Sequence, residues 1–326
     1  MSKYERVRAT IAGEPVDRPA VALWRHWPGD DQRAEDFAAA HLHWQQTFDF
    51  DLIKLTPSSA YCLQDWGINT CWSGGDEGTR AYRSTVIDSP EDWYRLPELD
   101  PASDYLATVR QGAKLVCQAI GDDVPIIMTI FSPLAQAKNL AGANLLPHLR
   151  HHPEAVLAGF ETISASILRY LGALKATGID GVFYAAQLAD ASRLSREEYQ
   201  HFGKPFDLQI LEATGDFWFN MLHIHGHDVY FDLFTDYPVQ AVNWHDRESG
   251  PSLAEGAKQF SGAVSGGLNR WTVQTGSPED VRSEAADAIS QTRGRRLILS
   301  TGCVAMTNSP LSNLRAARES VEISQD

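Results

Sequence analysis

Two histidines and a cysteine are the side chains that most clearly suggest chemistry in this sequence. His223 and His225 close an apolar run typical of a β-strand, and alternate residues of a strand point to one face. Gly226 follows them and lets the backbone turn closely, while Cys303 closes a second apolar run. Two imidazoles and a thiolate would make a three-ligand zinc site with an open fourth position, able to lower the pKa of a bound thiol or water. The alternative is a hydrogen-bonded histidine pair lining a polar pocket, with Cys303 as a small buried apolar side chain.

Further polar side chains close other apolar runs. Arg25 could hold a carboxylate or phosphate of a ligand, or form a structural salt bridge with the neighbouring acids at 30 and 31. His26 beside it could donate or accept a proton. Asn243 and His245 are alternate residues of one run. We expect Asn243 to hydrogen-bond a ligand and His245 to serve as an acid or base.

Tryptophans stand close to these polar groups. Trp24, Trp27 and Trp244 are flat walls suited to a ring-bearing substrate, although packing in the core is the more common use of tryptophan. Asn269 closes another run and is a candidate ligand contact. The histidines at 41, 43, 148, 151 and 152 fall on helical patterns, and we expect them to be solvated. The sequence contains no P-loop, GxSxG or CxxC motif.

Short strand-type runs alternate with longer helical segments along the whole chain. This alternation is typical of βα units and a parallel sheet. Eight such strands without a linker predict one α/β domain, a single (β/α)8 TIM-type barrel over residues 1–326, whose site lies at the carboxyl ends of the strands. Residues 58–100 are longer than a loop and predict a small hairpin inserted over the barrel mouth. The predicted strands are 21–27, 51–57, 124–131, 181–186, 219–226, 241–246, 263–268 and 297–303.

Helix signals fill the intervals between these strands. Ser195 opens a capping box with Glu198, and Ser277-Pro278 places a proline at the first helical position. We predict helices over 35–48, 102–120, 153–177, 195–215, from 277 onward and 309–321.

Composition limits the functional classes. The chain has 326 residues and a net charge of −14, which disfavours nucleic acid as a partner because no strong basic patch offsets it. No apolar run is long enough to span a membrane, and the N-terminus lacks the apolar stretch of a signal peptide. We therefore expect a cytoplasmic protein, in which the four cysteines are thiols and not disulfides.

The ordered motifs resemble those of the uroporphyrinogen decarboxylase superfamily. RVRATIAGEPVDRPAVALWR resembles the superfamily's approach to the first strand, and VPIIMTIFSPLAQAKNLAG resembles its third strand and following helix. GIDGVFYAAQ, AVNWHD, SGGLN and LILSTGCVAMTNSPLSNLRA follow in the superfamily's order. The resemblance covers nearly the whole chain and implies (β/α)8 enzymes, among them zinc-dependent methyltransferases that act with methyl-corrinoid proteins.

Departures from the decarboxylase pattern distinguish this chain from the true decarboxylases and bring it closer to the methyltransferases of the superfamily. True decarboxylases carry MRQAGRYL after the first strand, where this chain has LWRHWPGDD with only the first arginine, Arg25. Gln187 stands in the stretch where they have an aspartate, and Cys303 where they have a Gly-His-Gly sequence. The methyltransferase branch has His-x-Cys on strand five and Gly-Cys on strand eight. His223 and Cys303 match that pattern, and His225 replaces the cysteine.

The resemblance therefore implies metal-assisted methyl transfer to a thiol or a corrinoid-linked acceptor. Zinc, or another divalent metal, would be held by His223, His225 and Cys303, with the fourth ligand unidentified. Arg25, Trp24, Gln187, Asn243 and Asn269 would contact a small-molecule substrate. A corrinoid protein would be a partner, and a homodimer is a further expectation. The alternatives are cofactor-free decarboxylation of a uroporphyrinogen-like tetrapyrrole and, from another class, a non-catalytic tetrapyrrole- or corrinoid-binding partner protein.

Overall fold

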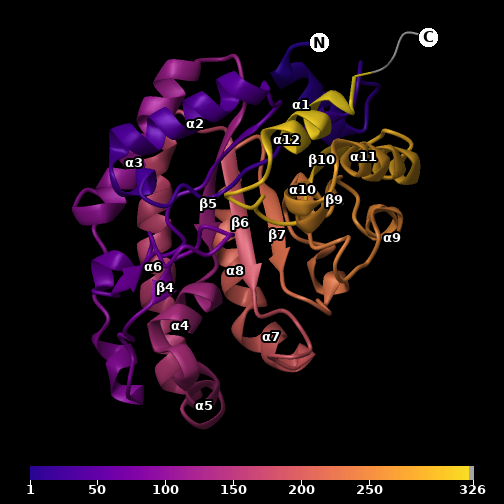
Figure 1. Ribbon diagram of the computed structural model, residues 1–326. Coiled ribbons are helices and arrows are strands. Elements are labelled where there is room, and N and C mark those ends of the chain that lie inside the picture. Colours follow the sequence, from indigo (N-terminus) through magenta and orange to yellow (C-terminus); the bar gives the residue numbers. More distant parts are fainter. Residues whose placement is uncertain (323–326) are drawn as a thin grey trace.

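Eight parallel strands form one curled sheet at the centre of the computed structural model, which describes residues 1–322 (Figure 1). Each predicted strand is present, and the predicted α/β class is confirmed. The first two strands, β1 and β2, are shorter than predicted and pair over two and three residues. The sheet order is β1-β10-β9-β8-β7-β6-β5-β2. The bounds are β1 (Ala20–Val21), β2 (Ile53–Leu55), β5 (Ile126–Phe131), β6 (Gly181–Gln187), β7 (Met221–His225), β8 (Ala241–Trp244), β9 (Ala263–Leu268) and β10 (Leu297–Thr301).

A buried aspartate joins the two edge strands of this sheet. The backbone N–H of Asp51 donates to the carbonyl of Val21 over 2.9 Å, and the Asp51 carboxylate accepts the Val21 N–H over 2.9 Å. Arg6 and Arg18 each donate to the same carboxylate over 2.7 Å. Since both arginines pair with it, the negative charge of Asp51 is compensated inside the protein. These bonds bring β1 and β2 together at the amino-terminal end of the sheet.

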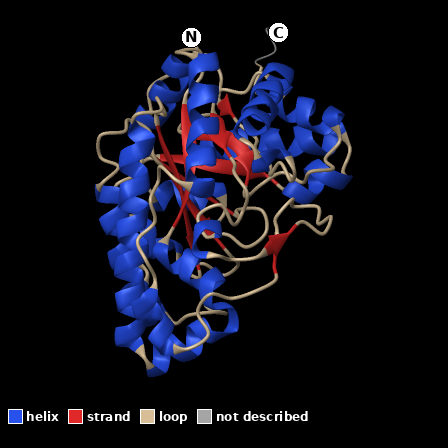
Figure 2. Cartoon of the chain, turned by 90° about the vertical axis from the view of Figure 1, so that its left-hand side faces the viewer, coloured by secondary structure: helices blue, strands red, loops and turns tan. Residues whose placement is uncertain are grey.

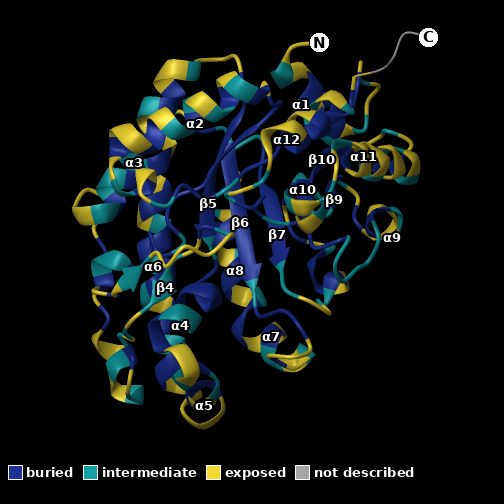
Figure 3. Ribbon diagram, viewed as in Figure 1, coloured by how far each residue is buried: buried dark blue, intermediate teal, exposed yellow. Residues whose placement is uncertain are grey.

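Helices surround the strands, and their outer faces carry the exposed residues (Figures 2 and 3). The capping boxes at Ser195 and Ser277 are both formed. The predicted helix over 195–215 is two helices, because Pro205 lacks the N–H that a continuous helix requires. The helices are α1 (Lys3–Ala12), α2 (Ala34–Phe48), α3 (Asp104–Ile120), α4 (Pro133–Ala141), α5 (Leu145–His151), α6 (Pro153–Lys175), α7 (Arg196–Phe202), α8 (Lys204–Glu212), α9 (Leu253–Gln259), α10 (Arg270–Thr275), α11 (Pro278–Thr292) and α12 (Leu311–Glu319).

The segment between β2 and α3 contains the predicted hairpin. Its strands β3 (Thr70–Cys71) and β4 (Ala81–Tyr82) pair antiparallel. A 3-10 helix, η3 (Pro90–Arg95), follows and buries Trp93. Among the described residues, no helix is both long and apolar enough to cross a membrane.

Two of the histidines expected to be solvated are buried instead. His41 bonds the Phe37 carbonyl over 2.8 Å and accepts the Thr56 N–H over 3.0 Å. His148 accepts the indole N–H of Trp93 over 3.1 Å. In both cases the imidazole satisfies a polar group inside the core, which the helical pattern alone did not indicate.

Candidate metal centre

Three histidines and one cysteine converge at the carboxyl ends of β7, β8 and β10. One ligand atom from each of His223, His225, His245 and Cys303 lies within 4.8 Å of the others. The Nδ1 atom of His225 is 3.4 Å from His223 Nε2, 3.3 Å from His245 Nε2 and 3.9 Å from Cys303 Sγ. The structure thus brings together the three residues predicted as ligands and adds His245 to them.

Asn243 fixes the tautomer of His223. The amide nitrogen of Asn243 donates to two backbone carbonyls, those of Ser265 (2.9 Å) and Thr301 (3.1 Å). Carbonyls only accept, so Asn243 Oδ1 must face His223 Nδ1, which is 2.7 Å away. His223 therefore carries its proton on Nδ1 and presents the lone pair of Nε2 to the cluster. This is the arrangement that metal-ligating histidines adopt.

Glu248 orients the ring of His245 in a similar way. Its carboxylate lies 3.4 Å from His245 Nδ1 and accepts from Arg270 over 3.0 Å. Because a carboxylate only accepts, Nδ1 of His245 carries the proton and Nε2 faces the cluster. Burial favours the protonated form of Glu248, but His245 and Arg270 outweigh it and lower its pKa to about 2.

The convergence of these donor atoms favours a positive charge at the cluster, either a proton or a metal ion. Two Nε2 atoms and one sulfur surround His225 Nδ1, which can carry at most one proton. Burial alone would raise the pKa of Cys303, yet the neighbouring histidines hold it well below its usual range. Burial opposes the protonation of His245, but Cys303 and Glu248 raise its pKa to about 9, so a proton supplies positive charge here. A donor set of three imidazoles and a thiolate equally suits zinc or a similar divalent metal.

A cavity of about 230 Å³ opens onto this cluster. Trp24 and Phe183 line it together with His223, His225 and Cys303, whereas His245 lies behind them. The ring of Phe183 stacks on His223, with centroids 5.2 Å apart and planes at 23°. We call this space the inner cavity.

Lys54 brings a buried amine without a carboxylate partner into the inner cavity. Only 5% of this residue is exposed, and its ammonium group donates to Thr56 Oγ1 over 3.2 Å and lies 4.5 Å from the centroid of Phe183. No described carboxylate pairs with it within 4.0 Å. Burial lowers its pKa to about 7, although the Cys303 thiolate acts in the opposite direction. Arg80, another cavity residue, also pairs with no described carboxylate.

Three of the other predicted site residues line the inner cavity. They are Trp24, His26 and Gln187. His26 Nδ1 lies 3.2 Å from the Pro57 carbonyl, and burial lowers its pKa to about 4. Gln187 Oε1 accepts from Lys138 over 3.0 Å.

Three predicted substrate contacts lie elsewhere. Arg25 points away from the inner cavity, with its guanidinium stacked 4.2 Å from the centroid of Trp27. Asn269 caps α10 by accepting the Trp271 N–H over 2.9 Å. Asn243 is fully buried and contacts His223, a candidate metal ligand, instead of lining the inner cavity. Lys54 was missed by the sequence reasoning, although a lysine within an apolar strand run is a detectable signal.

Comparisons with known proteins identify the family of this chain and solved structures that share its fold. The family model for uroporphyrinogen decarboxylase (URO-D) matches residues 2–323. Two relatives are methylcobamide:CoM methyltransferases MtbA, from Methanosarcina acetivorans (20% identical) and Methanosarcina mazei (22% identical), and each alignment covers 97% of both chains. A methyltransferase structure from Methanosarcina mazei superimposes with a TM-score of 0.86 at 17% identity over 98% of both chains. A B12-independent methionine synthase from Shewanella sp. W3-18-1 gives 0.61 at 14% identity over 92% of this chain and 93% of that one.

The fold and the cluster define a parallel α/β protein with a histidine–cysteine centre at the carboxyl ends of its strands. The chain belongs to the uroporphyrinogen decarboxylase family.

Proposed function

We propose that this protein is a metal-dependent methyltransferase that moves a methyl group from a corrinoid to a small thiol. The convergence of His223, His225, His245 and Cys303 at the inner cavity carries the proposal. The two relatives are named methylcobamide:CoM methyltransferases, and these names supply the reaction type. We treat the curled sheet as a (β/α)8 barrel whose mouth receives the donor.

The four side chains would hold zinc or another divalent metal, with His245 as a fourth ligand that yields its place to the substrate thiol and not as an acid or base. When bound, such a metal favours the thiolate form of a substrate thiol at neutral pH. Asn243 and Glu248 keep two imidazole rings in the ligating tautomer. The donor set is harder than one with two thiolates, which widens the choice of metal beyond zinc.

Cationic groups of the inner cavity would orient the acceptor. Lys54 and Arg80 face the same space as Cys303, so they would bind an anionic group carried by the thiol. The thiol would release its proton to solvent, its sulfur would form a bond to the methyl carbon, and the carbon–cobalt bond would break with its electron pair staying on the corrinoid. His26, with a pKa of about 4, is a poor base at neutral pH and would serve as a hydrogen-bond partner of the ligand.

Porphyrinogen decarboxylation is less well supported. The one arginine retained from the decarboxylase pattern, Arg25, stacks on Trp27 instead of facing the inner cavity.

The proposal is tested by incubating the zinc-loaded protein with methylcobalamin and CoM and following demethylation of the cobalamin by absorbance. We expect turnover that Cys303→Ala reduces at least about a hundredfold, as loss of a metal ligand should. Cys117→Ala removes a buried thiol of α3 and should keep the rate within about twofold. Binding of the cobalamin without turnover in any protein would instead support a corrinoid-binding partner protein.

A further inference from the structure

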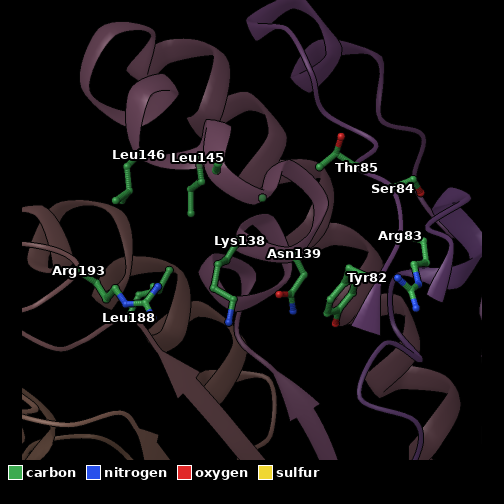
Figure 4. Close-up of a pocket in the computed structure, with 12 residues that line it drawn as sticks. Tyr82, Arg83, Ser84, Thr85, Lys138, Asn139, Leu145, Leu146, Leu188 and Arg193 are labelled. Carbon is green, nitrogen blue, oxygen red and sulfur yellow. The ribbon is translucent and has the colours of Figure 1, made fainter. Parts of the chain in front are cut away.

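A second and larger cavity lies beside the inner one. It has a volume of about 680 Å³ and is lined by α4, α5, the residues that follow β4 and the loop after β6 (Figure 4). We call it the outer cavity. Tyr82, Lys138 and Asn139 line both spaces. The two cavities therefore share one wall, and a ligand in the outer cavity lies next to the approach to the metal centre.

The charged side chains of the outer cavity are all cationic. They are Arg83, Lys138 and Arg193, and no aspartate or glutamate lines the space. In Figure 4, Lys138 and Asn139 lie between Arg193 on one side and Arg83 on the other. Three positive charges on the wall of one cavity repel each other. The chain as a whole has a net charge of −14, so the wall of this cavity is opposite in sign to the rest of the protein.

These three cations also lack the carboxylate partners that nearby arginines have. Arg150 and Arg196 form ion pairs of 2.7 Å with Glu198 and Asp232. Within the described residues, by contrast, no carboxylate lies within 4.0 Å of the cavity's cations. Lys138 donates to Gln187 and Arg83 to Cys71 Sγ, both neutral acceptors. Burial and Arg193 lower the pKa of Lys138, which Asp190 only partly opposes.

The backbone at the wall is also strained. Leu188, the first residue after β6, has φ of 69°, a left-handed conformation that is unfavourable for a leucine. Such strain concentrates at ligand-binding positions. At Leu188 it turns the chain after β6 so that both Leu188 and Arg193 line the outer cavity.

We propose that the outer cavity is an oxyanion-binding site for the acidic end of an extended ligand. Arg83, Lys138 and Arg193 would bind its phosphate or carboxylate group by charge-assisted hydrogen bonds. The other end of the ligand would pass Tyr82 and Asn139 into the inner cavity. That second part rests on the proposed function, whereas anion binding in the outer cavity does not depend on the metal or on methyl transfer.

The test measures binding of inorganic phosphate and, separately, of citrate to the purified protein by calorimetric titration. We expect saturable binding of at least one of them to a single site. Which anion binds more tightly distinguishes a phosphate from a carboxylate ligand. The double variant Arg83→Gln/Arg193→Gln should weaken that binding at least about tenfold, because it removes two of the three charges that would hold the anion.

Arg295→Gln is the matched control. Arg295 is exposed, forms no ion pair with the described carboxylates and precedes β10, at the opposite end of the strands. This variant should bind the anions like the wild type. Equal weakening in both variants would show diffuse attraction and overturn the proposal, as would the absence of saturable binding. Circular dichroism confirms that the variants fold, and Lys138→Gln provides an independent single-charge variant that should also weaken binding.

Discussion

Two buried charges three residues apart in the chain differ in how they are compensated. Asp51, at the amino-terminal end of the sheet, is fully buried and bonds two arginines and one backbone N–H. Lys54, which faces the inner cavity, is almost as buried but has no described carboxylate partner. An isolated buried charge costs several kcal/mol, so a protein retains one where a ligand compensates it. The comparison indicates that one end of the sheet serves stability and the other serves binding.

Asp51→Ala should have the largest effect, which is a loss in the free energy of unfolding. It leaves Arg18 without its buried partner and Arg6 with Asp17 alone, and it removes the side-chain bond to the Val21 N–H that helps to join the edge strands. Loss of one partner of a buried ion pair costs about 3–5 kcal/mol, which chemical denaturation would measure. Asp216→Ala removes an exposed partner of Lys175 and should cost at most about 1 kcal/mol. Equal effects would mean that Asp51 is not the structural charge described here.

Asn243→Ala tests the metal end of the sheet. Without the Asn243 oxygen, the proton of His223 is no longer confined to Nδ1. Loss of such a supporting group typically lowers metal affinity 10–100-fold, or about 1.4–2.7 kcal/mol. Competition with a chromophoric zinc chelator would measure it. Asn308→Ala, an exposed asparagine outside the site, should leave the affinity unchanged. An unchanged affinity in Asn243→Ala would contradict the role of this residue.

Lys54→Met separates binding from stability. We expect KM for an anionic thiol to rise about tenfold, close to the loss of one charge-assisted hydrogen bond, while KM for a neutral thiol stays the same. Lys258→Met, on the exposed face of α9, is the matched control. If Lys54 only packs against its neighbours, both thiols will be affected equally.

The pKa of about 7 for Lys54 gives the same variant a pH signature. This value lies below the ordinary lysine value of about 10.4, so the unfolded chain binds more protons than the folded one between pH 7 and the ordinary value. The contribution of Lys54 to stability therefore rises with pH across this window and is constant below it. Lys54→Met should lose this rise in the metal-free protein, as denaturation at several pH values would show.

The smallest effect concerns a carboxyl-end residue with a structural role. Asn269→Ala removes the cap of α10 and should cost about 1 kcal/mol without changing metal affinity or KM. Asn269→Asp, which can also cap, should restore most of the stability. A change in KM with unchanged stability would return Asn269 to the substrate contacts predicted from the sequence.

The strands and the convergence of the candidate metal ligands were largely predictable because each depends on a local pattern. All eight predicted strands are present. Short apolar runs bounded by polar residues are typical of buried strands and are too short for most helices. His223, His225 and Cys303 meet because parallel strands end at the same edge of the sheet. The resemblance to a known family then supplied the chemistry that the HxH spacing alone could not.

The remaining site residues depended on side-chain direction, which the sequence does not show. Arg25 closes a predicted strand, but β1 ends at Val21 and the guanidinium stacks on Trp27. His245 belongs to the candidate ligands because its Nε2 lies 3.3 Å from His225 Nδ1, a distance that the sequence does not show. The cations of the two cavities come from a strand, a hairpin, a helix and a loop, as Lys54, Arg80, Lys138 and Arg193 show. No short motif connects them, so only the fold could bring them together.

Metal content tests the central claim most directly. The purified protein, loaded with zinc and dialysed, would be analysed by mass spectrometry beside His223→Ala and beside His43→Ala, which changes an exposed histidine of α2. We predict about one zinc ion per chain in the wild type and in His43→Ala, and a loss of most of it in His223→Ala. A metal-free wild type, or a His223→Ala variant that retains its full zinc content, would contradict the metal centre.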